Sequence, residues 1–263
     1  MWYHENMERG GGTVTQRVAF VSGGGSGLGK ATVLTLIDEG WSVAFTYHHS
    51  EESAKSIATL AAETGGEVMP IRANLLLRDE ALHAASSALH HFGQVDAFVH
   101  NFGPFVFERR RLAEYSDDDF EEMLTGNLRS FWWMYRVLIP NMRERGFGRI
   151  VTLGSDGAGL AAGWGRRAPY AAAKAGLASL TRSIAREERE FGVTANMVCP
   201  GDVRGKNKEL ARNEAESVSK KTPVGGDVAR VVSFYCQPAS HQLNGTVTEV
   251  NGGADIRFLD EHA

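Results

Sequence analysis

The chain has 263 residues, of which 43% are hydrophobic and 23% are charged. This length suits one large domain and is short for two domains of ordinary size. The composition is that of a globular protein and excludes a disordered, fibrous or membrane-spanning class. The formal net charge of −4 provides no overall field that would attract nucleic acid or an anionic membrane. We therefore expect one compact domain with neither kind of partner.

The two cysteines and the N-terminus bear on the compartment. Cys199 and Cys236 are far apart and outside any Cys-x-x-Cys or Cys/His cluster. Neither a disulfide framework nor a metal site is expected, and a reducing compartment, the cytoplasm, fits best. Residues 1–15 mix charged residues with glycines and lack the apolar run of a signal peptide. We predict a flexible arm over 1–15 and one domain over 16–263.

Short apolar or β-branched runs alternate along the chain with longer segments of helical period. This alternation is typical of a parallel sheet with helices on both faces. Helices are expected from Leu28 to Gly40 and before Val95, where Gly93 ends an alanine-rich helical pattern. Seven strands are expected, over residues 18–22, 42–47, 67–72, 95–100, 149–153, 194–199 and 246–250. The predicted fold is a doubly wound, parallel, seven-stranded α/β sheet.

A third helix is expected to begin at Ser116, an N-cap residue followed by three aspartates in the first turn. Asn127 lies beside its apolar stripe and is expected to point inward, where the amide needs a hydrogen-bond partner. Considered alone, this Asn would tie two helices together. The predicted stripe comprises Phe120, Leu124, Leu128, Phe131 and Tyr135.

The first strand is connected to the first helix by a glycine-rich turn over residues 22–29. Gly23, Gly27 and Gly29 let backbone N–H groups approach a phosphate, and the helix N-terminus favours an anion. A tight connection alone would also use glycine, but the position after the first of seven strands favours a dinucleotide cofactor. No carboxylate stands at residues 45–50 to repel a 2′-phosphate, so NADP(H) is favoured over NAD(H). Because no Arg or Lys is there either, Thr46, His48 or Ser50 would have to donate to it.

Tyr170 and Lys174 lie four residues apart on one face of an expected helix. A free phenol, with a pKa of about 10, is a poor acid at neutral pH, and a neighbouring ammonium lowers that pKa. Ser155 follows the fifth strand at the sheet edge where ligands bind, and would contact a carbonyl or serve only as a turn residue. The polar stretch Gly201 to Gly225 follows another strand and is either a substrate-covering loop or a surface loop.

The order of these motifs resembles the short-chain dehydrogenase/reductase superfamily across nearly the whole chain. The resemblance includes Asn101-Phe102-Gly103 and Cys199-Pro200-Gly201, and residues 170–177 and 251–253 are most similar to β-ketoacyl-acyl-carrier-protein reductases. It implies an NAD(P)-binding, Rossmann-type reductase domain over 16–263 that uses NADPH to reduce a carbonyl. Enoyl reductases are less similar because they usually place the tyrosine and lysine further apart.

The resemblance also implies roles for single residues. Tyr170 would protonate the carbonyl oxygen and Ser155 would orient it. Lys174 would lower the tyrosine pKa and hold the nicotinamide ribose, and Asn127 would hold a water of the proton relay. Relatives are usually tetramers, so a homotetramer or homodimer is expected, packed through the small residues between Ala171 and Ala178. The cofactor would be lined by Gly23, Ser26, Gly27, Leu28, Gly29, His48, Asn74, Leu75, Asn101, Gly103, Tyr170, Lys174, Pro200, Gly201 and Val203.

The chain departs from the family at several positions. His100 and Phe102 replace two residues of an Asn-Asn-Ala-Gly segment, and Asn74 stands where relatives carry an aspartate for the adenine. Gly205 replaces a threonine that contacts the carboxamide. The extra residues between Leu160 and Arg167 border the expected pocket, so the substrate shape is expected to differ.

Three classes of function remain open. The leading one is reduction of a 3-oxoacyl thioester on an acidic acyl carrier protein. The second is reduction or oxidation of another small ketone, sugar or steroid, and the weakest is a non-catalytic nucleotide-binding protein. Residues 109–111 have the alternative interpretation of an ordinary solvated turn. The arginines that would dock the carrier are Arg109, Arg110, Arg111, Arg129, Arg166 and Arg167.

Overall fold

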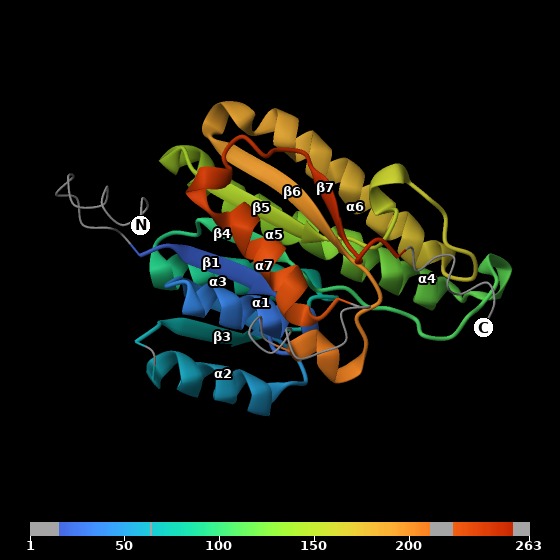
Figure 1. The fold of residues 1–263 in the computed structure, drawn as a ribbon, viewed down its shortest axis with the longest axis horizontal. Coiled ribbons are helices and arrows are strands. Elements are labelled where there is room, and N and C mark those ends of the chain that lie inside the picture. Colours follow the sequence, from blue (N-terminus) through green and yellow to red (C-terminus); the bar gives the residue numbers. More distant parts are fainter. Residues whose placement is uncertain (1–15, 64, 211–222, 255–263) are drawn as a thin grey trace.

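The computed structural model describes residues 16–63, 65–210 and 223–254 (Figure 1). Within them seven strands form one parallel sheet in the order β3-β2-β1-β4-β5-β6-β7, which confirms the predicted doubly wound fold. The arm predicted over residues 1–15 lies outside the described residues. The strands are β1 (Val18–Ser22), β2 (Ser42–Tyr47), β3 (Val68–Arg72), β4 (Ala97–His100), β5 (Gly148–Leu153), β6 (Val193–Pro200) and β7 (Val247–Val250).

The strand boundaries differ slightly from the predicted ones. β4 begins at Ala97 rather than at Val95. The Val95 amide donates to the side chain of Asn141 at 3.3 Å and so belongs to the turn before the strand. The strand order reverses between β1 and β4, which opens a crevice at their carboxyl ends, where such sheets bind ligands.

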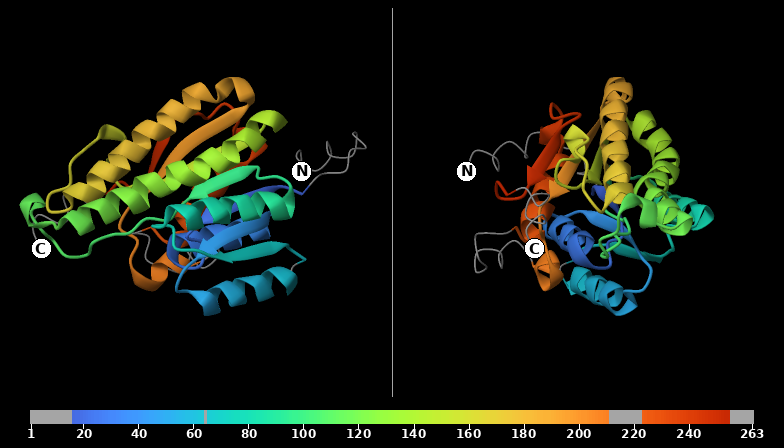
Figure 2. Two further views of the ribbon diagram at one scale, coloured as in Figure 1. Left: turned by 180° about the vertical axis from the view of Figure 1, so that it is seen from behind. Right: turned by 90° about the vertical axis from the view of Figure 1, so that its right-hand side faces the viewer.

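Six long helices cover the two faces of the sheet (Figure 2). One face packs against α1 (Gly27–Asp38), α2 (Glu51–Glu63) and α7 (Gly225–Cys236). The other packs against α3 (Arg78–Phe92), α5 (Ser130–Arg145) and α6 (Ala168–Glu187). The predicted stop after α3 is present, since Gly93 adopts a left-handed φ of 73° and its amide bonds Leu89 O.

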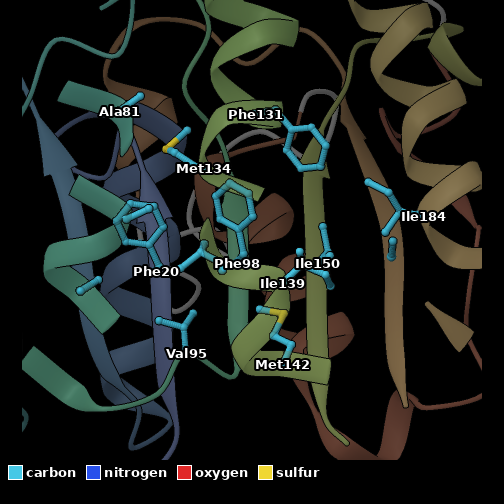
Figure 3. Close-up of a cluster of buried hydrophobic side chains, with 14 of the residues drawn as sticks. Phe20, Ala81, Val95, Phe98, Phe131, Met134, Ile139, Met142, Ile150 and Ile184 are labelled. Atoms are coloured by element: carbon cyan, nitrogen blue, oxygen red, sulfur yellow. The ribbon is translucent and has the colours of Figure 1, made fainter. Parts of the chain in front are cut away.

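Aromatic rings fill the core beneath α5. Phe98 of β4 stacks on Phe131 of α5, with ring centroids 5.6 Å apart, and lies 5.8 Å from Phe20 of β1. Figure 3 shows these three rings beside Met134. Because both faces of the central strands are covered, their residues are nearly all apolar and buried. This packing holds the carboxyl ends of β1 and β4 beside the crevice.

The helix predicted from Ser116 begins as expected but is not uniform. The Ser116 hydroxyl accepts from the Asp119 amide at 3.1 Å. Helix α4 (Asp117–Leu124) is followed by a π-helical turn, η2 (Thr125–Arg129), and then by α5. The wider turn rotates the residues before it out of phase with those after it. The predicted single stripe is therefore wrong at its start, because Phe120 is 36% exposed whereas Phe131 is 1% exposed.

Replacing the central ring tests this core. We expect Phe98→Ala to lower the free energy of unfolding by about 3–5 kcal/mol, because the lost ring leaves a cavity between β4 and α5. Phe234→Ala on α7 is the control, since that side chain is 53% exposed. Chemical denaturation of both variants makes the measurement. Equal losses of unfolding free energy in the two variants would contradict the assignment of Phe98 to the core.

Candidate active site

The glycine-rich turn is tied to two neighbouring strand ends. The Gly23 amide donates to Thr46 Oγ1 at 2.8 Å, and Gly23 O accepts from Asn101 Nδ2 at 2.9 Å. A Cβ on Gly29 would lie 2.1 Å from Gly23 O and 2.5 Å from Asn101 Nδ2. No side chain fits at position 29. The backbone at the start of α1 therefore lies directly against the glycine-rich turn. This cradle suits the phosphates of a dinucleotide.

A cavity of about 1070 Å³ opens at the carboxyl edge of the sheet. Its size lies just above the range of about 300–1,000 Å³ typical for one drug-sized ligand, so it has room for a nucleotide and a second molecule. It brings most of the predicted site residues together. Those on its wall are Gly23, Ser26, Gly27, Leu28, Asn101, Gly103, Ser155, Tyr170, Lys174, Pro200, Gly201 and Val203.

Four predicted cofactor residues do not lie on this wall, and one of them, Gly29, belongs to the phosphate cradle described above. The Leu75 side chain is packed in the core. The Asn74 side chain accepts from the Leu76 amide at 3.1 Å and so closes the turn before α3. His48 rests against His49, with ring centroids 3.8 Å apart. Cofactor contacts by these residues remain predictions.

Tyr170 and Lys174 occupy successive turns of α6, and Ser155 follows β5 opposite them. Lys174 Nζ lies 5.6 Å from the centre of the Tyr170 ring and donates to Leu153 O at 2.7 Å. Burial lowers the pKa of Lys174 to about 8. Ser155 itself is 7% exposed. All three residues face the same cavity.

The pKa of Tyr170 is not lowered by Lys174, contrary to what the sequence had led us to expect. Burial raises the pKa of Tyr170 above its ordinary value, the Cys199 thiol raises it further, and the Arg167 guanidinium opposes both. The sequence predicted a lower pKa caused by Lys174. Because Lys174 donates to the Leu153 carbonyl, loss of water around the phenol dominates in the structure.

Asn127 lies on the π-helical turn and is completely buried. Its amide nitrogen donates to Pro104 O at 2.9 Å and to Met123 O at 3.1 Å, so the predicted inward orientation is confirmed. Its Oδ1 has no hydrogen-bond partner among the residues that the structure describes. A Cβ on Gly103 would lie 2.1 Å from this oxygen and 3.4 Å from Lys174 Nζ. Gly103 thus keeps open the space between them.

His100, which departs from the family pattern, stabilises the strand ends beside the crevice. Ser22 Oγ accepts from the amides of Asn101 and Phe102, both at 3.1 Å, and lies 3.1 Å from His100 Nδ1. Since the hydroxyl already accepts twice, we infer that it donates its proton to Nδ1. Burial, followed by the nearby Lys174, lowers the pKa of His100 and keeps the ring neutral. The histidine therefore holds the ends of β1 and β4 together.

The described part of the polar stretch after β6 lines the cavity beside the glycine-rich turn, and residues 211–222 of that stretch lie outside the described residues. Its described part includes the short helix η5 (Gly205–Glu209), which packs against α1. Glu209 Oε1 accepts from the Gly27 amide at 3.0 Å, and its Oε2 pairs with Lys30 Nζ at 3.0 Å. The first contact lowers the pKa of Glu209. The sequence predicted a polar loop here but not the contact that the Glu209 carboxylate makes.

Aromatic residues at the other end of the cavity were also missed. Phe105, Phe107 and Trp164 line it, together with Arg109 and Arg167. Trp164 lies among the extra residues between Leu160 and Arg167, which were predicted to border the pocket. In the described parts of the chain, no cluster of His, Cys, Asp or Glu suits a metal ion, and no helix is both long and apolar enough to cross a membrane.

Substitution of Gly29 tests the phosphate cradle. We expect Gly29→Ala to weaken binding of NADPH by about tenfold or more, because the methyl group displaces the backbone that approaches the phosphate. The control is Gly163→Ala, where an added Cβ meets nothing within 4 Å. Fluorescence titration gives the dissociation constants, and circular dichroism checks the fold. Equal affinities in the two variants would show that the cradle does not bind the cofactor.

The comparisons with known proteins agree with this geometry. A family model described as "Enoyl-(Acyl carrier protein) reductase" matches residues 23–255. The Bacillus subtilis (strain 168) protein named "Putative oxidoreductase YtkK" is 40% identical over 247 residues, which are 91% of this chain and 97% of that protein. The solved "Structure of putative 3-oxoacyl-reductase from bacillus thuringiensis" has a TM-score of 0.87 and 38% identity, covering 91% of this chain and 98% of the other.

A second solved structure, a "blue fluorescent protein from metagenomic library in complex with NADPH", has a TM-score of 0.79 and 31% identity. It covers 90% of this chain and 97% of its own. These matches span the sheet, the glycine-rich turn and the helix that carries Tyr170 and Lys174. The chain belongs to the short-chain dehydrogenase/reductase family of NAD(P)-dependent oxidoreductases.

Proposed function

We propose that this oxidoreductase reduces a carbonyl compound to an alcohol with NADPH. The observation that carries the proposal is the position of Ser155, Tyr170 and Lys174 on one cavity that continues to the glycine-rich turn. The Tyr-x-x-x-Lys spacing further supports carbonyl reduction over enoyl reduction.

The roles of the side chains follow from their chemistry. When bound, the dihydronicotinamide supplies a hydride to the carbonyl carbon. Ser155 donates a hydrogen bond to the carbonyl oxygen, and the Tyr170 hydroxyl donates its proton to the same oxygen. Since burial disfavours the resulting phenolate, a nearby cation has to stabilise it. We assign this role to Lys174, which with a pKa of about 8 is mostly an ammonium at neutral pH, together with Arg167, which lowers the pKa of Tyr170.

NADPH is the proposed cofactor for two reasons. No carboxylate stands at residues 45–50, where one would repel the 2′-phosphate. The metagenomic relative was solved in complex with NADPH. Fluorescence titrations with NADPH and NADH compare the two directly, and tighter binding of NADH would overturn the assignment.

Removing the proposed acid tests the reaction. We expect Tyr170→Phe to lower kcat by about a hundred- to ten-thousand-fold, because the variant lacks the hydroxyl that is proposed to donate the proton. NADPH binding should stay unchanged. Tyr235→Phe serves as the matched control, since that hydroxyl bonds Thr248 and the residue lies outside the cavity wall. Retained turnover in Tyr170→Phe would favour a different acid, and no turnover in the unaltered chain on any carbonyl would favour the non-catalytic alternative.

Three of the six arginines expected to dock an acyl carrier protein are engaged within the chain. Arg110 pairs with Asp119 at 2.6 Å and with Glu108, and Arg129 pairs with Glu121 at 2.6 Å. Arg167 is buried and donates to backbone carbonyls. Similarity to the "putative 3-oxoacyl-reductase from bacillus thuringiensis" supports a 3-oxoacyl substrate. The pairing of these arginines supports a free small carbonyl compound over a carrier-bound one.

A carrier comparison distinguishes the two substrate classes. We expect kcat/KM for acetoacetyl thioesters of acyl carrier protein and of N-acetylcysteamine to agree within about tenfold at low salt, because Arg110, Arg129 and Arg167 are already engaged within the chain and steer the protein carrier less. A larger, salt-sensitive advantage for the carrier protein would instead establish the 3-oxoacyl-acyl-carrier-protein reductase.

We also propose self-association through α5 and α6. Trp132 of α5 is 47% exposed, and Leu180 and Ala172 of α6 are exposed as well. Large apolar side chains beside a small-residue helix suit close packing against a second copy. We expect Leu180→Arg to lower the mass measured by light scattering, with Leu60→Arg on α2 as the exposed control. If Leu180→Arg and the unaltered chain have the same mass, self-association through α5 and α6 is ruled out.

A further inference from the structure

An aromatic wall, made of Phe105 and Trp164, bounds the cavity beside Tyr170. The Phe105 ring meets the Tyr170 ring edge to face, with centroids 4.9 Å apart and an interplanar angle of 86°. Trp164 lies 6.3 Å from Tyr170 and 6.1 Å from Phe105. Both members line the cavity that holds Ser155. A carbonyl presented to Tyr170 therefore has to carry its attached groups along these rings.

Arg167 holds the two rings of the aromatic wall in place. Its guanidinium lies 4.5 Å from the centre of the Phe105 ring and 5.5 Å from that of Trp164. It also donates to Val106 O and, at 3.1 Å, to Phe107 O. One cation thus joins the segment after β4 to the segment before α6. Because the rings are held before a substrate arrives, little conformational entropy is lost on binding.

The chemistry of the wall favours flat, unsaturated molecules. Aromatic pairs gain energy from stacked or edge-to-face contacts beyond the area that they bury. Rings offer no partners for the hydroxyls of a sugar, which would lose their hydrogen bonds to water. A flexible acyl chain buries area there but gains no contact between π systems.

We propose that the substrate is a planar cyclic ketone fused or conjugated to an aromatic ring, stacked on Phe105 and Trp164. The proposal rests on the carbonyl reduction proposed above. The carbonyl carbon gains the hydride of NADPH and the oxygen gains the proton of Tyr170. The C=O π bond breaks, and the product is the ring alcohol.

A matched pair of ketones tests the proposal. We expect kcat/KM with NADPH to be about tenfold higher for 2-tetralone than for 2-decalone, its saturated counterpart. Phe105→Leu and Trp164→Leu should remove this ratio, whereas Trp164→Phe should keep it. Phe234→Leu on α7, an exposed residue outside the cavity, is the control. A ratio near one in the unaltered chain, or a ratio that survives both Leu variants, overturns the aromatic site.

A binding measurement separates this proposal from the proposed reaction. In Tyr170→Phe with NADP⁺ present, 2-tetralone should quench tryptophan fluorescence at lower concentration than 2-decalone, and Trp164→Phe should reduce the quenching. If no ketone is turned over by the unaltered chain, the proposed function fails. Selective binding of 2-tetralone then still supports the aromatic site, and equal binding of the two ketones overturns it.

A second and independent observation concerns the cofactor end. Glu209 holds the Gly27 amide at 3.0 Å, at the N-terminus of α1 where the phosphate cradle lies. The backbone around Glu209 is itself docked against α7, because the Gly226 amide donates to Leu210 O at 2.8 Å. Gly225 approaches so closely that a Cβ there would lie 2.0 Å from Lys208 O. The carboxylate is thus held in place from both helices.

We infer that Glu209 competes with the cofactor phosphate for the N-terminus of α1. Two anions cannot share the Gly27 amide, since each needs the same donor and repels the other. Cofactor binding therefore requires Glu209 to leave, which frees Lys30 for the incoming anion. The contact stabilises the cofactor-free chain at the expense of cofactor affinity.

Neutralising this carboxylate tests the competition. We expect Glu209→Gln to bind NADPH about three- to tenfold more tightly, and the cofactor-free variant to melt at a lower temperature. Glu144→Gln at the exposed end of α5 is the control. Titration by fluorescence and thermal denaturation give the two values. Unchanged or weaker NADPH binding in Glu209→Gln overturns the inference.

Discussion

All strands of the described sheet run in the same direction, and this constraint places every functional segment at one edge. The end of β1 supplies the glycine-rich turn, the end of β4 supplies Asn101, and the end of β5 supplies Ser155. Strands far apart in the sequence therefore meet at one cavity. Contacts between strand ends, such as Gly23 O with Asn101 Nδ2, set the distances between these segments. The chemistry depends on the sheet through these few backbone contacts.

Burial gives the site its electrostatic character. It lowers the pKa of Lys174 to about 8 and raises that of Tyr170, so the cation is weakened and the acid becomes a poorer donor. The two shifts act against the proposed proton transfer. Arg167, which lowers the pKa of Tyr170, offsets part of this effect from the wall of the cavity. The residue that fixes the aromatic rings thus also favours the phenolate.

The sheet could be predicted because its signals are local. Apolar runs indicate the strands, and the glycines at the end of β1 indicate the turn. Neither signal depends on contacts with distant parts of the chain. The stripe from Phe120 failed because the π-helical turn around Asn127 changes the helical period. No pattern in a single sequence predicts such a π-helical turn. The spacing of Tyr170 and Lys174 predicted that both side chains share one helix face, and α6 is regular there.

The residues that sequence reasoning missed lie on connecting segments. Phe105 and Trp164 meet only because Arg167 bonds the backbone of the opposite segment, which is a tertiary contact without a sequence signature. Glu209 reaches Gly27 from 182 positions away in the chain.

The Gly27 amide that Glu209 binds and the carbonyls of Val106 and Phe107 that Arg167 binds are all backbone groups. Such contacts let the connecting segments change while the strand ends keep their places. The sheet therefore fixes where the carbonyl and the phosphate bind, and the two connecting segments decide which molecules reach those positions.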